Sequence, residues 1–298
     1  MGLSILIPVF NFDVTLLVND LSDQLKQSGR VGEIVLIDDG SDASFEALNK
    51  LLSHFPFVKY SRNVVNTGRT ATRKLLAESA QNDYLLFLDC DSKIIKDNFL
   101  QVYFEQIDFN EQLVCGGRIY SPHAPEKCSL HLHWKYGSIR ESINKKKKNG
   151  PAFMSHNFLV NKSLFLKLNF RDLLNGYGHE DSFWGIQFRQ MDIIIKQINN
   201  PVLHNQLEEA DDFINKSNQA LNNLLVMAKL VDGNYLKSEI KIYRWYKRLQ
   251  SIGLASIFSL MERPFHSLMR SNLVSCKPSL IFFDLYRLAL LIRMTGKK

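Results

Sequence analysis

Two carboxylates follow directly on an apolar run of strand length. Residues 84–88 are all apolar or aromatic, and Asp89, Cys90 and Asp91 come next. Since alternate side chains of an extended backbone point to the same side, Asp89 and Asp91 can face one ligand while Cys90 points back into the protein. Two oxygen donors at this spacing suit Mg²⁺ or Mn²⁺ shared with a diphosphate. Alone the signal is weak, because Asp-x-Asp pairs are also common in solvated turns.

Two further strand-like runs end in the same manner. The stretch 33–37 leads into Asp38 and Asp39, followed by a turn-forming glycine, and the stretch 3–9, which contains Pro8, ends in a polar exit. Ligands of open α/β sheets bind at the carboxyl ends of the strands. We therefore expect three strand ends to meet at one edge of a sheet.

Four segments, in this order, resemble the nucleotide-sugar motifs of family 2 glycosyltransferases with the GT-A fold: Ile7–Asn11, Ile37–Ser41, Asn66–Arg73 and Leu88–Asp91. A fifth segment, Asn175–Trp184, is similar to the Gly-aromatic-Gly-x-Glu-Asp acceptor-site motif of the inverting galactosyl- and N-acetylhexosaminyltransferase branch. The order and intervals of the motifs make the set more specific than any one member. The resemblance covers residues 3–205.

Strand and helix patterns alternate along the chain. Strands are expected at 3–9, 32–38, 57–60, 84–88, 113–115, 152–160 and 193–196, and helices at 13–28, 43–54, 69–81, 96–106, 130–144 and 181–190. This alternation predicts an α/β fold with a mostly parallel, doubly wound sheet. With the resemblance, it predicts a GT-A catalytic domain at 1–205 and a helical C-terminal extension at 206–298. Helices of the extension are expected at 206–231, 236–250, 253–261 and 279–294.

The resemblance implies a divalent metal site for Mn²⁺ or Mg²⁺. Its ligands would be Asp91, Asp89 directly or through water, and His204 at the end of a late strand. A divalent ion stabilises the negative charge that develops on a departing diphosphate. The alternative for His204 is a structural histidine.

The fifth motif implies the residues on the acceptor side. Asp181 would be the general base for the acceptor hydroxyl, and Glu180 would hold an acceptor or donor hydroxyl. Alternatively, both acids favour the start of a helix, where negative charge is stabilised. Tyr177 and Trp184 offer flat faces for sugar stacking, although an aromatic residue on a helix is more often in the core. His179 departs from the family pattern, which leaves the acceptor open.

The nucleoside of the donor would be held by the first two motifs. Phe10 can stack on a base, and either Asp38 or Asp39 can accept the N3–H of uracil. Pro8 belongs to the same donor-binding group.

Further donor contacts are implied by the later motifs. Asn66 and Asp89 belong to the donor site, and Arg73 would approach the phosphates or hold the Asp89 loop. Asn157 would hydrogen-bond the donor sugar or else cap the following turn. The lysine run 145–148 is either a solvated loop or a segment that closes over the phosphates.

The composition is that of a globular protein without a membrane span. The 298 residues are 45% hydrophobic, and no apolar stretch reaches the 18 or so residues needed to cross a bilayer. Met1 leads directly into a core strand, with no signal peptide. The four cysteines lack metal-type spacing and are interpreted as reduced thiols. These features predict a cytoplasmic protein.

The net charge of +7 is uneven. From residue 236 onward there are twelve Lys and Arg against three acids. No nucleic-acid-binding module is recognisable. Residues 241–248 mix Tyr243, Trp245 and Tyr246 with basic residues, which suits an anionic membrane surface on the inner face of the cytoplasmic membrane. Alternatively, these helices pack on the catalytic domain and leave basic faces exposed.

The resemblance implies an inverting, metal-dependent transfer of a hexose or N-acetylhexosamine. The donor would be a UDP-sugar and the acceptor a hydroxyl of a surface glycan or lipid-linked glycan. One alternative is a non-catalytic binding or scaffold protein that keeps the GT-A fold. Another is a sugar-nucleotide nucleotidyltransferase, which needs a Gly-rich, Lys-containing loop after the first strand, and residues 8–13 lack both features.

Overall fold

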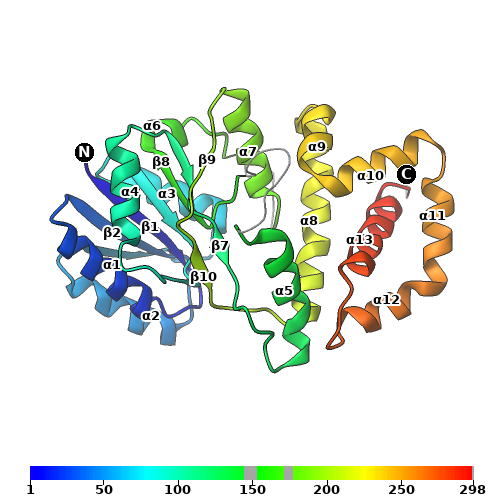
Figure 1. Ribbon diagram of the computed structural model, residues 1–298, viewed down its shortest axis with the longest axis horizontal. Coiled ribbons are helices and arrows are strands. Elements are labelled where there is room, and N and C mark those ends of the chain that lie inside the picture. The colour runs from blue at the N-terminus through cyan, green and yellow to red at the C-terminus, as the bar shows by residue number, and fades with distance from the viewer. Residues whose placement is uncertain (144–152, 171–176, 297–298) are drawn as a thin grey trace. The chain divides into compact units, whose positions relative to one another are not determined.

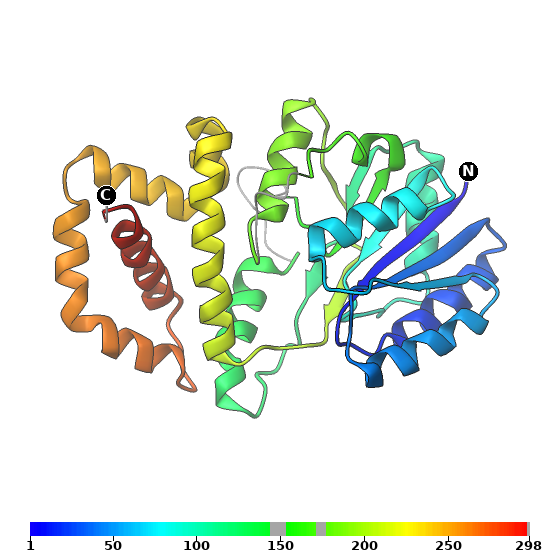
Figure 2. The ribbon, with the colours of Figure 1, turned by 180° about the vertical axis from the view of Figure 1, so that it is seen from behind.

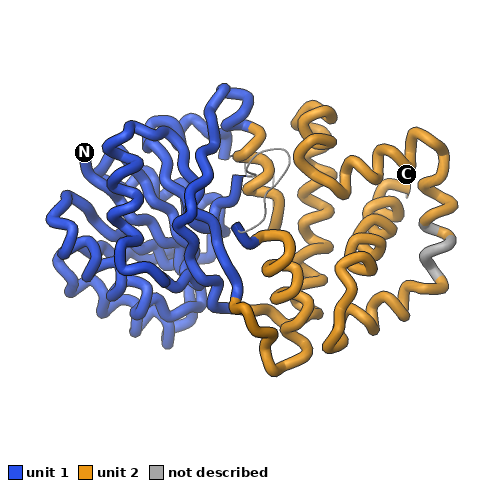
Figure 3. The backbone as a smooth tube through the Cα atoms, viewed as in Figure 1, with its two compact units in different colours: residues 1–120, 142–172, 187–206 blue, residues 121–141, 173–186, 207–298 orange. Residues whose placement is uncertain are grey.

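The computed structural model describes residues 1–143, 153–170 and 177–296 (Figure 1). Its contacts divide into two compact units, coloured separately in Figure 3: unit 1 is residues 1–120, 142–172 and 187–206, and unit 2 is residues 121–141, 173–186 and 207–298. Unit 1 ends one residue beyond the predicted boundary at 205. Unit 2 also takes in two earlier segments, 121–141 and 173–186. The lysine run 145–148 lies outside the described residues.

Unit 1 is built on a seven-stranded sheet with the order β3-β2-β1-β4-β8-β6-β9. Its strands are β1 (Leu3–Val9), β2 (Gly32–Asp38), β3 (Val58–Arg62), β4 (Tyr84–Leu88), β6 (Leu113–Cys115), β8 (Asn157–Asn161) and β9 (Lys196–Gln197). The first four run parallel to one another, β8 runs antiparallel to both β4 and β6, and β9 is parallel to β6. The predicted α/β fold with a mostly parallel sheet is confirmed.

A second, three-stranded sheet lies within unit 1. It has the order β5-β10-β7, with β5 at Ser92–Lys93, β10 at Val202–His204 and β7 at Arg118–Ile119. β10 pairs antiparallel with β5, and this register sets His204 opposite Ser92. A residue more than a hundred positions away is thereby brought beside the end of β4.

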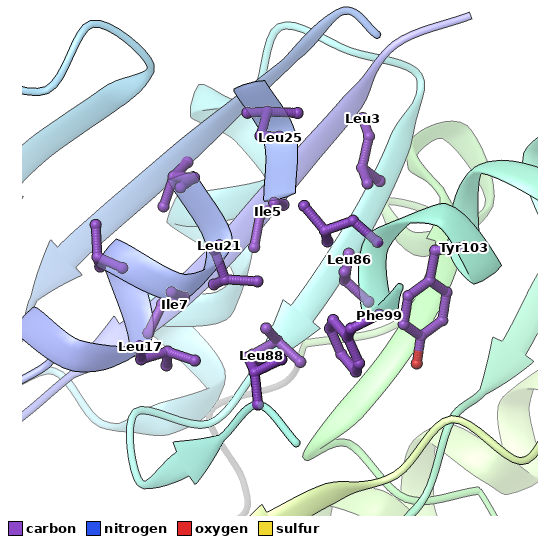
Figure 4. Close-up of a cluster of buried hydrophobic side chains, with 14 of the residues drawn as sticks. Leu3, Ile5, Ile7, Leu17, Leu21, Leu25, Leu86, Leu88, Phe99 and Tyr103 are labelled. Atoms are coloured by element: carbon purple, nitrogen blue, oxygen red, sulfur yellow. The ribbon is translucent and has the colours of Figure 1, made fainter. Parts of the chain in front are cut away.

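Helices cover both faces of the large sheet. On one face, Ile5 and Ile7 of β1 lie beside Leu21 of α1 (Thr15–Ser28), and Leu86 and Leu88 of β4 lie beside Phe99 and Tyr103 of α4 (Phe99–Asp108), as Figure 4 shows. The other face packs against α3 (Arg69–Ser79), seen from behind in Figure 2. The remaining helices of this unit are α2 (Ala43–Lys50), the 3₁₀ turn Leu51–His54 and α6 (Lys162–Phe165).

One predicted strand is wrong in position. Ile193 and Ile194 are not in a strand, and β9 begins only at Lys196. Ile194 is 85% exposed, so the apolar run does not mark a buried strand. The strand is instead the short stretch that pairs with β6.

Unit 2 is helical. Its elements are the 3₁₀ turn Cys128–Leu130, α5 (His131–Tyr136), the π turn Gly137–Glu141, the first part of α7 (Glu180–Gln190), α8 (Ala210–Leu230), α9 (Gly233–Glu239), α10 (Lys241–Ser251), α11 (Ala255–Glu262), the 3₁₀ turn Arg263–Phe265, α12 (His266–Leu273) and α13 (Leu280–Thr295). α13 packs against α5, α8, α10, α11 and α12. Phe213 and Phe283 stack in its core, 5.6 Å between ring centroids.

The predicted helix at 236–250 is two helices. Ile240 adopts an extended conformation and separates α9 from α10. Tyr243 and Tyr246, predicted to face a membrane, are buried and pack inside unit 2. The sequence prediction also missed α12. No helix among residues 1–143, 153–170 and 177–296 is long and apolar enough to cross a membrane.

The interpretation of all four cysteines as reduced thiols is wrong for two of them. Cys128 and Cys276 form a disulfide within unit 2, joining the turn before α5 to the turn before α13. They are 148 residues apart, so no local spacing indicated the pair. Cys90 and Cys115 keep their thiols.

Candidate active site

The first carboxylate after β4 is held by arginines. Asp89 is buried, and its Oδ1 lies 2.6 Å from Nη2 of Arg73, while its Oδ2 lies 3.9 Å from Nη2 of Arg118. Burial raises the pKa of Asp89, but the charges of Arg73, Arg69 and Arg118 outweigh it and hold the pKa well below its ordinary value. Asp89 is therefore a fixed anion in the interior.

The second carboxylate faces a histidine. Oδ2 of Asp91 lies 3.4 Å from Nδ1 of His204. The pairing of β5 with β10 and the hydrogen bond from Asn205 N–H to the Asp91 carbonyl oxygen fix this approach. Burial raises the pKa of Asp91, and the hydrogen bond and charge of His204 lower it further than burial raises it. The structure thus brings together two of the three predicted metal ligands.

The side chains of Asp91 and His204 suit a hard divalent ion that is also bound by the phosphates of a substrate. Within the described residues no three His, Cys, Asp or Glu side chains are grouped so that they could hold a metal ion. Asp91 and His204 supply one carboxylate and one imidazole, and Asp89 is turned toward Arg73. Mg²⁺ is commonly bound by one or two carboxylates, substrate phosphates and water, so these residues fit Mg²⁺ or Mn²⁺ accompanied by a diphosphate.

Arg73 does not reach outward to phosphates. It is 1% exposed, and besides Asp89 it donates to the carbonyl oxygen of Ser155 at 3.3 Å. Of the two predictions for this residue, the structure supports the one in which Arg73 holds the Asp89 loop. Its contact with the donor stays a prediction.

The two acids after β2 are both buried but have different hydrogen-bond partners. Asp38 is fully buried and accepts from Ser41 N–H and Tyr60 O–H, so it shapes the turn. Asp39 is 4% exposed, and its Oδ1 accepts from Asn63 Nδ2 and from both N–H and O–H of Thr67.

The other carboxylate oxygen of Asp39, Oδ2, accepts from Gly68 N–H. A carboxylate has about four acceptor positions, so Oδ2 of Asp39 can take one further donor.

The other predicted nucleoside residues lie at the same strand ends. Phe10 follows β1 and is 48% exposed. Next to it Asn11 has a φ of 48°, and its N–H donates to the hydroxyl of Ser41. Asn66 is exposed. A Cβ added to Gly40 would lie 3.0 Å from the backbone nitrogen of Asn66, so the loop after β3 packs on the turn after β2. Pro8 lies in β1, partly buried.

Asn157, predicted to contact the donor sugar, lies within the large sheet. Asn157 is fully buried in β8, and its Oδ1 accepts from Tyr103 O–H at 2.5 Å. Its Nδ2 donates to the carbonyl oxygens of Gly117 and Asn200, both at 2.9 Å. Every polar atom of this side chain is thus used to join β8 to the segments beside it.

Two residues of the site were missed from the sequence. Arg118 in β7 lies beside Asp89 and also donates to Tyr120 O–H at 3.3 Å. His156, just before β8, is 2% exposed, and its two ring nitrogens have no hydrogen-bond partner within the described parts of the chain. Burial and the charge of Arg118 lower its pKa well below the ordinary value, so the ring is neutral. In the sequence, His156 could have been found only from its place directly before Asn157, which was predicted as a site residue.

The acceptor-site motif is anchored on α8 within unit 2. Gly178 has a φ of 103°, and a Cβ there would lie 2.4 Å from the Cβ of Ala220. Asn223 Nδ2 donates to the carbonyl oxygens of Tyr177 and Gly178. Only glycine fits at this approach. Asn175 and Gly176, the first residues of the motif, lie outside the described residues.

The acids and aromatics of this motif have different environments. Glu180 is buried, and its Oε2 accepts from Gly178 N–H at 3.0 Å, so it closes the turn. Asp181 is partly exposed in the first turn of α7. Tyr177 is partly exposed, with Nζ of Lys216 5.4 Å from its ring centroid. Trp184, predicted to stack on the acceptor or else to lie in the core, is 1% exposed.

His179 occupies a strained position in the motif. It has a φ of 71°, a region that residues with a side chain rarely adopt. Its Nδ1 lies 3.4 Å from the hydroxyl of Ser182, and its buried Nε2 has no hydrogen-bond partner in the parts of the chain described. Burial, with a smaller contribution from the charge of Arg287, lowers the pKa of His179 to about 3.

Comparison with known proteins identifies the class to which this fold and site belong. Residues 4–168 match the Glycosyl transferase family 2 domain. This is more than half of the chain, and the chain belongs to glycosyl transferase family 2. The α/β fold is of the GT-A type.

Among particular relatives, the chain is similar to an uncharacterized glycosyltransferase of Haemophilus influenzae, with 41% identity over 96 residues, 32% of this chain and 38% of that protein. It is also similar to Glycosyltransferase GlyG of Streptococcus pneumoniae, with 25% identity over 182 residues, 56% of this chain and 59% of that protein. The chain thus covers less than two thirds of either relative.

A solved structure shares the fold. The mannosyltransferase PcManGT of Pyrobaculum calidifontis, in complex with GDP-Man and Mn²⁺, matches 99% of this chain and 88% of its own, with a TM-score of 0.59 and 10% identity.

Replacing Arg73 tests the buried ion pair. Arg73→Met keeps the length of the side chain but leaves Asp89 as a poorly compensated buried charge, so the free energy of unfolding in urea should fall by about 3–5 kcal/mol. Adding Asp89→Asn should recover part of that loss, because the second change removes the unpaired charge. A cost below about 1 kcal/mol for Arg73→Met would contradict this account.

Replacing His179 tests the buried neutral imidazole. In the unfolded chain the His179 imidazole has its ordinary pKa of 6.5, whereas in the folded chain its pKa is about 3. Protonation therefore favours the unfolded chain, and the free energy of unfolding falls as the pH drops below 6.5. Relative to His179→Gln, the wild-type free energy of unfolding should fall by up to about 1.4 kcal/mol per pH unit between pH 6.5 and 4.5. The matched change at exposed His123, His123→Gln, should give no such divergence. Parallel pH profiles for wild type and His179→Gln would overturn the prediction.

Proposed function

We propose that this protein is an inverting glycosyltransferase that moves a hexose or N-acetylhexosamine from a UDP-sugar to a hydroxyl of a surface glycan or lipid-linked glycan. The observation that carries the proposal is the contact between Asp91 and His204 beside the buried Asp89–Arg73 pair, in a chain of glycosyl transferase family 2. The residue types suit a departing diphosphate, and their position at the carboxyl end of β4 is where an α/β sheet binds its ligand.

The nucleoside end of the donor would lie on the ends of β1 and β2. Phe10 has an exposed face for stacking on the base, and Asp39 Oδ2 can accept one more hydrogen bond. The N3–H of uracil is a donor of that kind. Guanine also offers N–H donors, and PcManGT was solved with GDP-Man, so UDP-sugars and GDP-mannose are to be compared directly.

We propose a divalent cation, Mn²⁺ or Mg²⁺, at Asp91 and His204. PcManGT, which shares the fold, was solved with Mn²⁺, and the donor set here is compatible with such an ion. When bound, the ion would stabilise the negative charge on the leaving diphosphate. Asp89 would keep Arg73 and Arg118 in place behind the site.

On the acceptor side we propose Asp181 as general base. In an inverting transfer the acceptor oxygen forms a bond to the anomeric carbon as the bond to the diphosphate breaks, and the hydroxyl proton must pass to a base. Asp181 is the partly exposed acid of the motif, whereas Glu180 is buried and bonded to the Gly178 turn. We assign Glu180 the role of holding that turn and Tyr177 the contact with the acceptor sugar.

A donor screen tests the reaction and the metal together. UDP or GDP release should be measured from a panel of nucleotide sugars, with and without Mn²⁺. Asp91→Asn should abolish both turnover and the metal-dependent thermal shift with UDP, because the phosphate charge is left uncompensated. Asp23→Asn, an exposed acid on α1, should change neither. Full turnover of the wild type in chelator would contradict the metal role, and no turnover with any donor would favour a non-catalytic protein.

The base is tested by a change that keeps shape. Asp181→Asn removes the proton acceptor, so kcat should fall by about 10²–10⁴ while the affinity for UDP stays nearly unchanged. Asp212→Asn, at an exposed acid on α8, serves as the control. Near-normal kcat for Asp181→Asn would move the role of base to another group.

A further inference from the structure

Five large apolar side chains are exposed along one continuous stretch of unit 2. Trp245 of α10 is 45% exposed, and Ile252 and Leu254 in the next turn are 56% and 43% exposed. On α11, Ile257 and Leu260 are 53% and 63% exposed. Single exposed apolar residues are ordinary, whereas a run of them marks an interaction site. We call these five residues the outer patch.

The members of the outer patch follow one another along α10, the turn after it and α11. Trp245 lies on α10, Ile252 and Leu254 lie in the turn on either side of Gly253, and Ile257 and Leu260 are three residues apart on α11, about one helical turn. The opposite side of α10 is occupied by Tyr243 and Tyr246, which are 4% and 5% exposed. α10 therefore has one side inside unit 2 and one apolar side in solvent.

Basic residues accompany the patch. Lys241 and Arg248 lie one turn before and one turn after Trp245 and are exposed, as is neighbouring Arg244. The Arg248 guanidinium lies 5.4 Å from the ring centroid of Trp245. Arg244 donates to the carbonyl oxygens of Lys237 and Ser238 at the end of α9, so we take Lys241 and Arg248 as the cations of this face that can contact a partner.

The charge of residues 240–261 indicates what kind of partner can bind the outer patch. Residues 240–261 contain four Lys or Arg and no Asp or Glu. In a symmetric dimer the same patch would face itself, which would oppose cation to cation. An anionic surface is complementary instead. A Trp and aliphatic residues flanked by Lys and Arg form the composition of segments that lie in the headgroup region of a bilayer.

We propose that the outer patch docks the protein on an anionic lipid bilayer. Trp245, Ile252, Leu254, Ile257 and Leu260 enter the boundary between headgroups and acyl chains, and Lys241 and Arg248 contact lipid phosphates. The face lies on the membrane and does not span it. This goes beyond the proposed transfer reaction, and its test measures binding alone, so the two can fail separately.

Vesicle flotation of the full chain tests the proposal. Vesicles of phosphatidylcholine with phosphatidylglycerol should carry the protein up at low salt, and vesicles of phosphatidylcholine alone should do so at least about tenfold less well, because the attraction is electrostatic and screened by salt. Ile257→Ser with Leu260→Ser should weaken binding by about tenfold or more, since two apolar side chains no longer leave water. Lys241→Gln with Arg248→Gln should remove the preference for anionic lipid.

Leu16→Ser with Val31→Ser, at two exposed apolar positions of unit 1, is the matched control and should float as the wild type does. Circular dichroism of each variant checks that it is folded. No co-flotation of the wild type, or equal flotation of the folded Ile257→Ser, Leu260→Ser variant, would overturn the proposal. A dimer in sedimentation that this variant dissociates, without vesicle binding, would assign the patch to a second copy of the chain.

Discussion

A guanidinium buried behind strand β4 holds the first carboxylate of the Asp-x-Asp pair. Arg73 is almost wholly removed from water, and removing a charge from water is costly unless a partner compensates it. Asp89, 2.6 Å away, is that partner. The pair joins α3 to the end of β4 and, through Ser155, to the approach to β8. With Asp89 fixed inward, the next carboxylate along the strand end, Asp91, meets His204.

The second constraint is a pairing of very short strands. β5 and β10 contain two and three residues, yet their antiparallel register is what sets His204 beside Asp91. Short pairings contribute little stability by themselves. They persist here because β10 also pairs with β7, which carries Arg118 to the other side of Asp89. The small sheet thus positions His204 and Arg118 beside the two carboxylates.

The acceptor-site motif is held by contacts with α8. Gly178 touches the backbone and Cβ of Ala220, and Asn223 caps the carbonyl groups of the turn, so α8 fixes the start of α7. His179 remains with a strained φ and a buried ring nitrogen that lacks a partner in the described chain. Strain of this kind persists where surrounding contacts over-determine the backbone, and it is common at functional sites. Its position beside Asp181 is consistent with the role proposed for the motif.

Elements whose signals are local could be predicted from the amino-acid sequence. The strands at 3–9, 32–38, 84–88 and 113–115 have the bounds that were predicted, because each is a continuous apolar run closed by polar residues or a turn. That Asp89, Asp91 and His204 lie close together was expected only from the resemblance of the motifs. In the structure the two carboxylates have different partners: Asp89 pairs with Arg73, and Asp91 faces His204.

Which polar and aromatic residues are buried depends on the three-dimensional packing. Asn157, Trp184, Tyr243 and Tyr246 have residue types suited to ligand or membrane contact, yet all four are buried. The disulfide between Cys128 and Cys276 and the neutral, enclosed His156 were likewise invisible. The physical reason is that burial and pairing depend on segments far apart in the chain, and a side chain's own type and spacing carry no record of what packs against it.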